Sequence, residues 1–229
     1  MKLVSRSEWL ESRKALLLKE KQLCREQEAL AEQRRNLPFV KIDKDYRFQS
    51  SAGEVSLAEL FGNCSQLIVY HFMFGEEWTE GCPSCSFWAD NYNGVQCHLA
   101  ARDTQLVAIA NAPLEKLQAY QDRMGWSFEF VSTQGSSFGT DFGVNFYAGD
   151  QTECQQGYNY GGKIHGEELP GISVFVRLDD GSIAHSYSAY GRGLDALNGA
   201  YHMLDLTPKG RNEAELPYTM AWLKRNDEY

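Results

Sequence analysis

The spacing of apolar residues changes near Leu37-Pro38, and this change divides the chain. From Ser5 to about Arg35 the sequence is nearly free of Gly and Pro and rich in Leu, Ala, Glu, Lys, Arg and Gln, which predicts one long helix. Ser5 and Glu8 match a capping box at its start. We expect three parts: a helical extension over 1–36, a main domain over 37–210 and a C-terminal tail over 211–229.

Apolar residues recur every seven positions along the predicted helix. The series is Trp9, Leu16, Leu23 and Leu30, with Leu10, Leu17, Cys24 and Ala31 beside it. Such spacing places a narrow apolar stripe on an otherwise charged rod. We expect this stripe to pack either on its own domain or on a second copy of the chain, as the antiparallel or swapped helix of a homodimer.

Short apolar runs after Pro38 predict strands that alternate with helices. The expected strands are 39–42 and 46–48 as a short hairpin, then 67–74, 105–110, 127–131, 172–178 and 182–187. The expected helical segments are a Ser-capped turn within 53–61, a stretch from 83 to about 102 interrupted at 91–94, then 114–124 and 194–206. This order of elements predicts an α/β fold.

A Gly-, Tyr- and Asn-rich stretch lies between the strand expected at 127–131 and the strand expected at 172–178. It runs over about 143–170 and holds Cys154, Tyr158, Tyr160 and His165. Because it is too long for a simple connector, we interpret it as an insertion near the active face. Cys154 is either a remote resolving thiol or a spectator.

Two cysteines stand where a strand passes into a helix. Gly81-Cys82-Pro83-Ser84-Cys85 follows the apolar run 67–74 and a short polar loop. At a first helical turn, free backbone N–H groups and the helix dipole stabilise a thiolate, which makes the thiol a nucleophile. Pro83 suits this position because the N–H that it lacks has no partner in a first turn. The alternative without a catalytic role is a pair of buried cysteines that only pack in the protein interior.

Composition and charge limit the remaining possibilities. The chain has 229 residues, 43% of them hydrophobic and 23% charged, and a net charge of -9. The acidic balance argues against nucleic acid or an anionic membrane as a partner. The start of the chain is charged and offers no apolar stretch of signal-peptide length, and no later stretch is long enough to span a bilayer, so we expect a cytoplasmic protein.

Six cysteines without an export signal suggest reduced thiols, of which one pair cycles. A metal-binding module is a competing interpretation, with Cys82, Cys85, Cys97 and either His98 or Cys64 as ligands. Zinc needs four converging ligands, however, and adjacent residues on one helix point to different faces. We therefore expect no metal and no other cofactor.

Several segments resemble a mainly bacterial thioredoxin-like family, catalogued as a domain of unknown function and related to the alkyl hydroperoxide reductase/thiol-specific antioxidant superfamily. The segments that carry the resemblance are Val4–Leu10, Gly81–Asp90, Gly171–Phe175, Tyr190–Asp195 and Leu204–Gly210. The resemblance implies a thioredoxin-like fold of the peroxiredoxin type, a three-layer sandwich with an added N-terminal helix. It also implies dithiol/disulfide oxidoreductase activity.

The same resemblance suggests roles for two further residues. Peroxiredoxins carry a Thr or Ser three residues before the reactive cysteine, and Thr79 stands there, but no Arg matches the one that they supply from a later strand. Thioredoxins place a cis-proline just before the strand that faces the thiols, where backbone next to it can pair with a substrate chain. Pro170 is the candidate here, although Gly171 separates it from Ile172.

The resulting hypothesis is that Cys82 attacks a disulfide or similar group as a thiolate and that Cys85 resolves the mixed disulfide. Ser84, Trp78 and Trp88 are supporting candidates, the two tryptophans as rim residues or as ordinary core or surface aromatics. The partners would be a disulfide or peroxide substrate and a thiol reductant. The alternatives are a thiol peroxidase and a non-catalytic interaction protein on the same fold.

Overall fold

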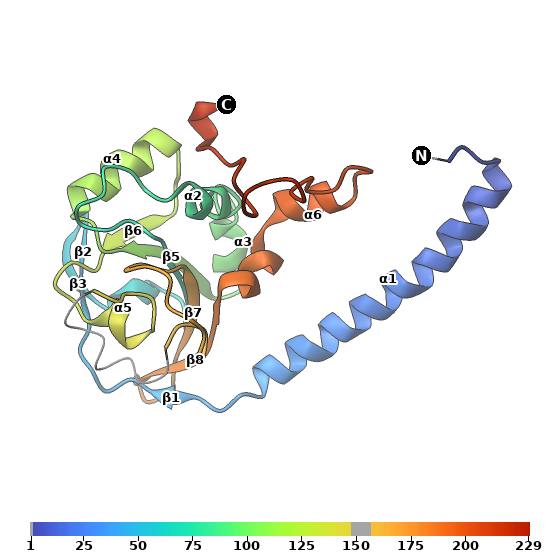
Figure 1. Ribbon diagram of the computed structural model, residues 1–229. Helices are drawn as coiled ribbons and strands as arrows, with labels where there is room; N and C mark the ends of the chain where they lie inside the picture. Colours follow the sequence, from blue (N-terminus) through green and yellow to red (C-terminus); the bar gives the residue numbers. More distant parts are fainter. Residues whose placement is uncertain (1, 148–156) are drawn as a thin grey trace. The chain divides into compact units, whose positions relative to one another are not determined.

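The computed structural model describes residues 2–147 and 157–229 (Figure 1). The chain folds as two compact units, Met1–Phe39 and Val40–Tyr229. The first unit contains helix α1 (Arg6–Arg35), and the second contains all the strands described below. The domain boundaries expected from the sequence stay a prediction.

Helix α1 begins as its sequence predicts. The Ser5 hydroxyl accepts a hydrogen bond from the backbone N–H of Glu8, and the Glu8 carboxylate accepts one from the backbone N–H of Ser5 at 2.9 Å. These two bonds satisfy N–H groups that the first turn leaves without partners. No residue of α1 is buried, and the stripe residues Trp9, Leu16, Leu23 and Leu30 are exposed. The partner of the stripe therefore stays a prediction.

A sheet of eight strands organises the second unit. The strands are β1 (Val40–Lys41), β2 (Arg47–Ser50), β3 (Gly53–Ser56), β4 (Gln66–His71), β5 (Thr104–Ala110), β6 (Glu129–Ser132), β7 (Gly171–Arg177) and β8 (Ile183–Tyr190). Their order across the sheet is β1-β8-β7-β4-β5-β6-β2-β3. The pairs β4–β5 and β5–β6 are parallel, whereas β7 and β8 form an antiparallel hairpin beside β4.

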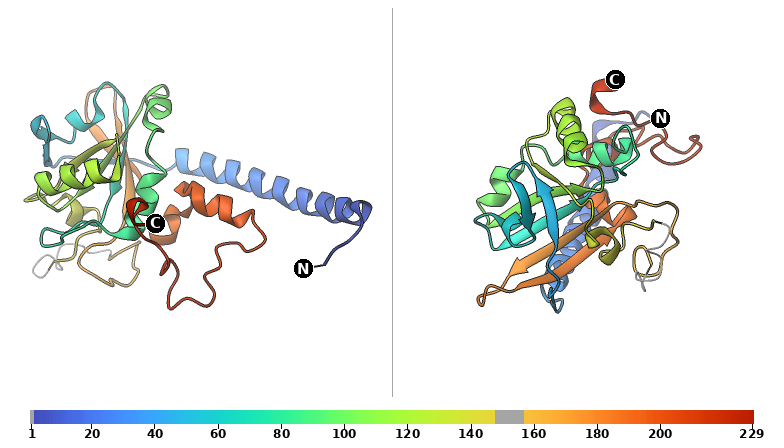
Figure 2. Two further views of the ribbon diagram at one scale, coloured as in Figure 1. Left: turned by 90° about the horizontal axis from the view of Figure 1, so that it is seen from above. Right: turned by 90° about the vertical axis from the view of Figure 1, so that its left-hand side faces the viewer.

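Helices and short helical turns connect these strands. They are η1 (Glu59–Phe61), α2 (Pro83–Asp90), α3 (Gln96–Ala100), α4 (Leu114–Met124), α5 (Phe138–Asp141), η2 (Gly191–Leu197), α6 (Gly199–Asp205) and η3 (Asn226–Glu228). Views from two sides show α2 and α4 together on one face of the sheet (Figure 2). The expected break after α2, the helix over 114–124 and the hairpin of β7 and β8 are confirmed.

Alternating side chains of the central strands fill two separate cores. On β5, Leu106 and Ala108 belong to the core under α2 and α4, whereas Val107 and Ile109 belong to the core on the opposite face. Successive residues of a strand point to opposite faces, so a strand covered on both sides is apolar throughout. The three-layer α/β sandwich expected from the sequence is confirmed.

Two expectations about local structure are wrong. Residues 39–42 and 46–48 do not form a hairpin, because β1 pairs with β8, while β2 pairs with β3 through a turn at Ser50–Gly53. Gly53 has a φ of 106°, a conformation that favours Gly and closes this turn. The helix expected over 194–206 is split, because the buried Asn198 side chain accepts from the backbone N–H of Tyr201 and starts α6 afresh.

Candidate active site

The backbone after β4 places Cys82 at the start of α2. Beyond the end of β4 at His71, the Cys82 N–H donates to the Met73 carbonyl at 3.0 Å. Cys82 is the N-cap residue of α2 and Pro83 its first helical residue. A Cβ at Gly81 would lie 2.6 Å from the Phe72 ring and 2.7 Å from the Tyr120 ring. Glycine therefore lets the loop pass close over these two rings.

The two thiols occupy opposite environments. Cys82 is partly exposed, whereas Cys85 is buried, and both are free thiols. A hydrogen bond from the Cys85 thiol, with further bonds from the Ser84 and Cys85 backbone N–H groups, lowers the pKa of Cys82 to about 6. Burial raises the pKa of Cys85, and the negative charge of Cys82 raises it further. The two shifts therefore favour a thiolate on Cys82 and a proton on Cys85.

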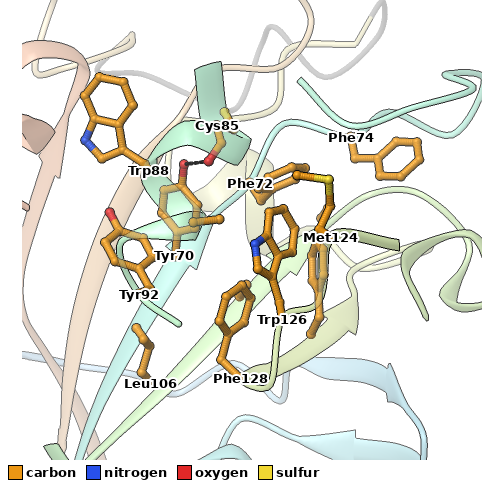
Figure 3. Packing of buried hydrophobic residues seen from close by; sticks show 14 of the residues in the cluster. Tyr70, Phe72, Phe74, Cys85, Trp88, Tyr92, Leu106, Met124, Trp126 and Phe128 are labelled. Atoms are coloured by element: carbon orange, nitrogen blue, oxygen red, sulfur yellow. Dashed lines mark hydrogen bonds between the residues drawn. The ribbon is translucent and has the colours of Figure 1, made fainter. Parts of the chain in front are cut away.

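Aromatic side chains support the helix that carries the thiols. The Tyr70 hydroxyl of β4 donates to the Cys85 carbonyl at 3.1 Å, the bond drawn in Figure 3. Tyr70 also packs edge-on against Tyr92 with a centroid distance of 5.0 Å. The Trp88 indole donates to the Leu194 carbonyl at 2.8 Å, which ties α2 to η2. These bonds fix the direction in which α2 presents its first turn.

A cavity of about 350 Å³ opens beside both cysteines. Its apolar wall is formed by Tyr70, Met73, Trp88, Pro170, Leu194 and Met220. Cys82, Ser84 and Cys85 complete one side, and Arg192 and Asp195 also line it. The Arg192 guanidinium is paired with the Asp195 carboxylate at 2.5 Å, so this polar part of the lining is a charge pair.

The C-terminal segment, expected as a tail, packs against the cysteine loop. The Arg225 guanidinium donates to the Gly81 carbonyl at 2.9 Å and to the Tyr120 hydroxyl at 3.0 Å. It also pairs with Glu80 at 3.0 Å. Sequence reasoning missed Arg225 and Met220 because no local pattern links residues this late in the chain to residue 82.

The loop before β7 forms the third side of the site. The Tyr158 hydroxyl donates to the Pro170 carbonyl at 2.6 Å and accepts from the Gly191 N–H at 2.7 Å, and both of these partners line the cavity. Glu168 is buried, and its carboxylate accepts a hydrogen bond from the Tyr147 hydroxyl. Burial raises the pKa of Glu168 to about 7.

The structure brings together only some of the residues predicted from the sequence. Ser84, Trp88 and Pro170 line the cavity with the cysteine pair. Thr79 is exposed, and Trp78 is a half-buried residue packed against the core, and neither lines the cavity in the described part of the chain. The cis-proline hypothesis for Pro170 is wrong, because residues 2–147 and 157–229 contain no cis peptide bond. Cys154 lies outside the described residues.

The described residues offer neither a metal site nor a helix that could span a bilayer. No group of three or more His, Cys, Asp and Glu side chains in the described ranges is arranged to hold a metal ion. Cys97 is exposed on the short helix α3. None of the helices described is both long enough and apolar enough to cross a membrane.

Parallel strands β4, β5 and β6, a closing antiparallel hairpin and a thiol pair at the start of α2 define the class of this protein as thioredoxin-like. A family model described as "Bacterial protein of unknown function (DUF899)" matches residues 1–229. The chain belongs to that family. No curated protein matches the chain.

The chain is also similar to several solved structures. A mutant of PrxQ from Xylella fastidiosa is 11% identical with a TM-score of 0.46 over 73% of this chain and 96% of that one. Peroxidoxin BcpB of Mycobacterium tuberculosis is 14% identical with a TM-score of 0.45 over 70% and 92%. A putative thioredoxin of Neisseria meningitidis is 15% identical with a TM-score of 0.41 over 69% and 90%.

Proposed function

We propose that the protein is a dithiol/disulfide oxidoreductase in which Cys82 is the nucleophile and Cys85 the resolving thiol. The observation that carries the proposal is the contrast between the two sulfurs. Cys82 has a lowered pKa and partial exposure beside a cavity, whereas Cys85 is buried and stabilises it by a hydrogen bond. A thiolate with a pKa just below the ambient pH combines a high ionised fraction with good nucleophilicity.

The chemistry follows in two exchanges. The Cys82 thiolate attacks one sulfur of a substrate disulfide, forms a mixed disulfide and releases the other substrate sulfur as a thiolate. Cys85 then loses its proton and attacks the Cys82 sulfur, which releases the second substrate thiolate and leaves a Cys82–Cys85 disulfide. The substrate gains two electrons and the pair loses two. A separate thiol reductant returns the pair to its dithiol form.

The first exchange makes the second one easier. The Cys82 thiolate raises the pKa of Cys85, both by accepting its hydrogen bond and by its charge. In the mixed disulfide Cys82 carries no negative charge, so both effects weaken and only burial still opposes ionisation of Cys85. Cys85 is therefore held protonated until it is needed.

Thiol peroxidase activity is less well supported. The residue that would correspond to the peroxiredoxin Thr is Thr79, and its side chain is exposed away from the cavity lining. Arg192 reaches the cavity, but it is paired with Asp195. A non-catalytic interaction protein would have no use for an ionised thiol beside a cavity.

Thiol trapping with mass spectrometry across a glutathione redox series tests the proposal. We expect one reversible Cys82–Cys85 disulfide in the wild type, no such bond in Cys82→Ser, and a trapped mixed disulfide in Cys85→Ser. Cys97→Ser is the matched control, since Cys97 is an exposed thiol on another helix. Wild-type protein that forms no intramolecular disulfide, or full disulfide reductase activity in both Cys82→Ser and Cys85→Ser, would overturn the assignment.

A further inference from the structure

The lining of the cavity beside Cys82 is mainly apolar. Met73, Leu194 and Met220 present apolar side chains, and Trp88 and Tyr70 present rings whose polar groups already donate to backbone carbonyls. The two charged lining residues, Arg192 and Asp195, form an ion pair with each other, and Arg211 also contacts the Asp195 carboxylate at 3.1 Å. An apolar molecule that binds in such a cavity gains free energy from the apolar surface that it buries. A charged group would lose its hydration there and find few hydrogen-bond partners.

The backbone beside Pro170 argues against an extended peptide as the occupant. The Leu169 N–H donates to the Val144 carbonyl at 2.9 Å, and the Pro170 carbonyl accepts from the Tyr158 hydroxyl at 2.6 Å. Gly171 is already paired with His71 on one side and with Tyr190 on the other. A substrate chain that approached here would have to displace these bonds, at a cost for each buried group left without a partner.

We propose that this cavity is a substrate pocket for small organic disulfides that carry an apolar substituent, a proposal that rests on the proposed function. The apolar group occupies the space between Met73, Leu194 and Met220. Its disulfide bond then lies against Cys82. The Cys82 thiolate forms a new bond to the substituted sulfur, the substrate S–S bond breaks, and the other half leaves as a thiolate with the electron pair. Cys85 completes the reduction as described above.

A comparison of two disulfides tests the pocket. Single-turnover rates of reduced full-length protein are measured separately with dibenzyl disulfide and with bis(2-hydroxyethyl) disulfide, whose substituents differ in polarity and in apolar surface. We expect the benzyl compound to react at least about tenfold faster, because a pocket discriminates by the apolar surface that it buries. The ratio of the two rates is the readout, since it cancels changes in the reactivity of Cys82 itself.

Variants of Met220 test whether the cavity wall causes the preference for the benzyl compound. Met220→Glu places a charge on the pocket wall and should bring the ratio close to one; Met220→Gln, with an uncharged polar side chain of similar size, should lower it less. Met203→Glu is the matched control, because Met203 is 71% exposed and does not line the cavity, and it should keep the wild-type ratio.

Three results would overturn the pocket, and the first two distinguish a failure of the pocket from a failure of the proposed function. If both disulfides oxidise the Cys82–Cys85 pair at similar rates, the pocket assignment is wrong while the oxidoreductase assignment stands. If neither disulfide, nor any glutathione redox condition, produces the Cys82–Cys85 bond, the proposed function fails and the pocket assignment fails with it. A benzyl preference that survives in Met220→Glu would also contradict the pocket.

Discussion

Two walls meet at the thiol site, and they come from very different parts of the chain. The near wall consists of residues 70–88: Tyr70, Met73 and the first turns of α2 with Cys82 and Cys85. The far wall consists of residues 158–225: the loop at Pro170, the turn at Arg192, and Met220 with Arg225 behind it. The near wall supplies the reactive sulfurs. The far wall shapes the cavity and holds the cysteine loop in place through Arg225.

The difference shows how local and long-range structure contribute to the site. The thiolate is stabilised by groups within a few residues of Cys82, so its chemistry is encoded locally. The cavity that selects a substrate exists only after β7, η2 and the C-terminal segment have folded against α2. Variants of the far wall should therefore change stability and selectivity, and variants of the near wall should change thiol reactivity.

The largest expected effect on stability comes from Glu168 in the far wall. Its pKa is about 7 instead of 4.5, so the folded protein holds a proton that the unfolded chain releases between these values. The stability that comes from this proton is present below pH 4.5 and is lost as the pH rises through 7. Glu168→Gln should thus stabilise the protein by up to about 3 kcal/mol near pH 8 and hardly at all near pH 4.

Urea unfolding of Glu168→Gln at several pH values checks this expectation. The amide oxygen of Gln can still accept the hydrogen bond of Tyr147, and the pH dependence of the stability difference separates the effect of the charge from any loss of the hydrogen bond that Glu168 accepts from the Phe74 backbone N–H. Glu215→Gln is the control, because Glu215 is an exposed carboxylate in another segment of the chain. A stability difference that does not change with pH would contradict the buried, proton-holding carboxyl.

Gly81→Ala should disturb the near wall most. The added Cβ would meet the Phe72 and Tyr120 rings at 2.6 and 2.7 Å, and overpacking of this kind costs about 1–3 kcal/mol. Because Cys82 follows directly, its alkylation rate should also change. Thermal unfolding and iodoacetamide alkylation measure the two effects. Gly166→Ala, whose Cβ would meet nothing closer than 3.7 Å, should leave both close to the wild type.

Arg225→Met removes the side-chain hydrogen bonds that join the C-terminal segment to the cysteine loop. It removes the donors to the Gly81 carbonyl and the Tyr120 hydroxyl, and the loss of such charge-assisted bonds costs about 2 kcal/mol. We expect a lower unfolding midpoint and faster proteolysis of the C-terminal segment. Lys224→Met, at the exposed neighbouring position, should show neither change. Equal stability of the two variants would mean that the far wall covers the cysteine loop without holding it.

The smallest expected effect on the thiol site comes from α1. If its stripe joins two chains as a homodimer, Leu16→Glu with Leu23→Glu should yield monomers, because charges would replace the apolar contacts. Thiol reactivity should stay unchanged. Leu18→Glu is the control, since Leu18 is 70% exposed and lies off the stripe. Light scattering gives the mass, and a wild-type monomer would rule out the dimer.

The contrast between the walls also explains how far the sequence could be interpreted. The capping box of α1, the helical spacing over 114–124 and the apolar run at 105–110 are local signals, and the elements that they predict are present in the structure. The cysteine pair was placed at its helix start for the same reason. The pairing of β1 with β8 and of Arg225 with Gly81 joins residues far apart in the chain, and no local pattern encodes such contacts.

The measurement that tests the central claim most directly is the pH dependence of Cys82 alkylation, followed by mass spectrometry in the wild type and in Cys85→Ala. The contrast between the two sulfurs predicts a wild-type midpoint at a pH of about 6. Cys85→Ala removes the thiol that donates to Cys82, so its midpoint should move upward. A wild-type midpoint near the ordinary thiol pKa of 9.0, or the same midpoint in both proteins, would contradict this contrast.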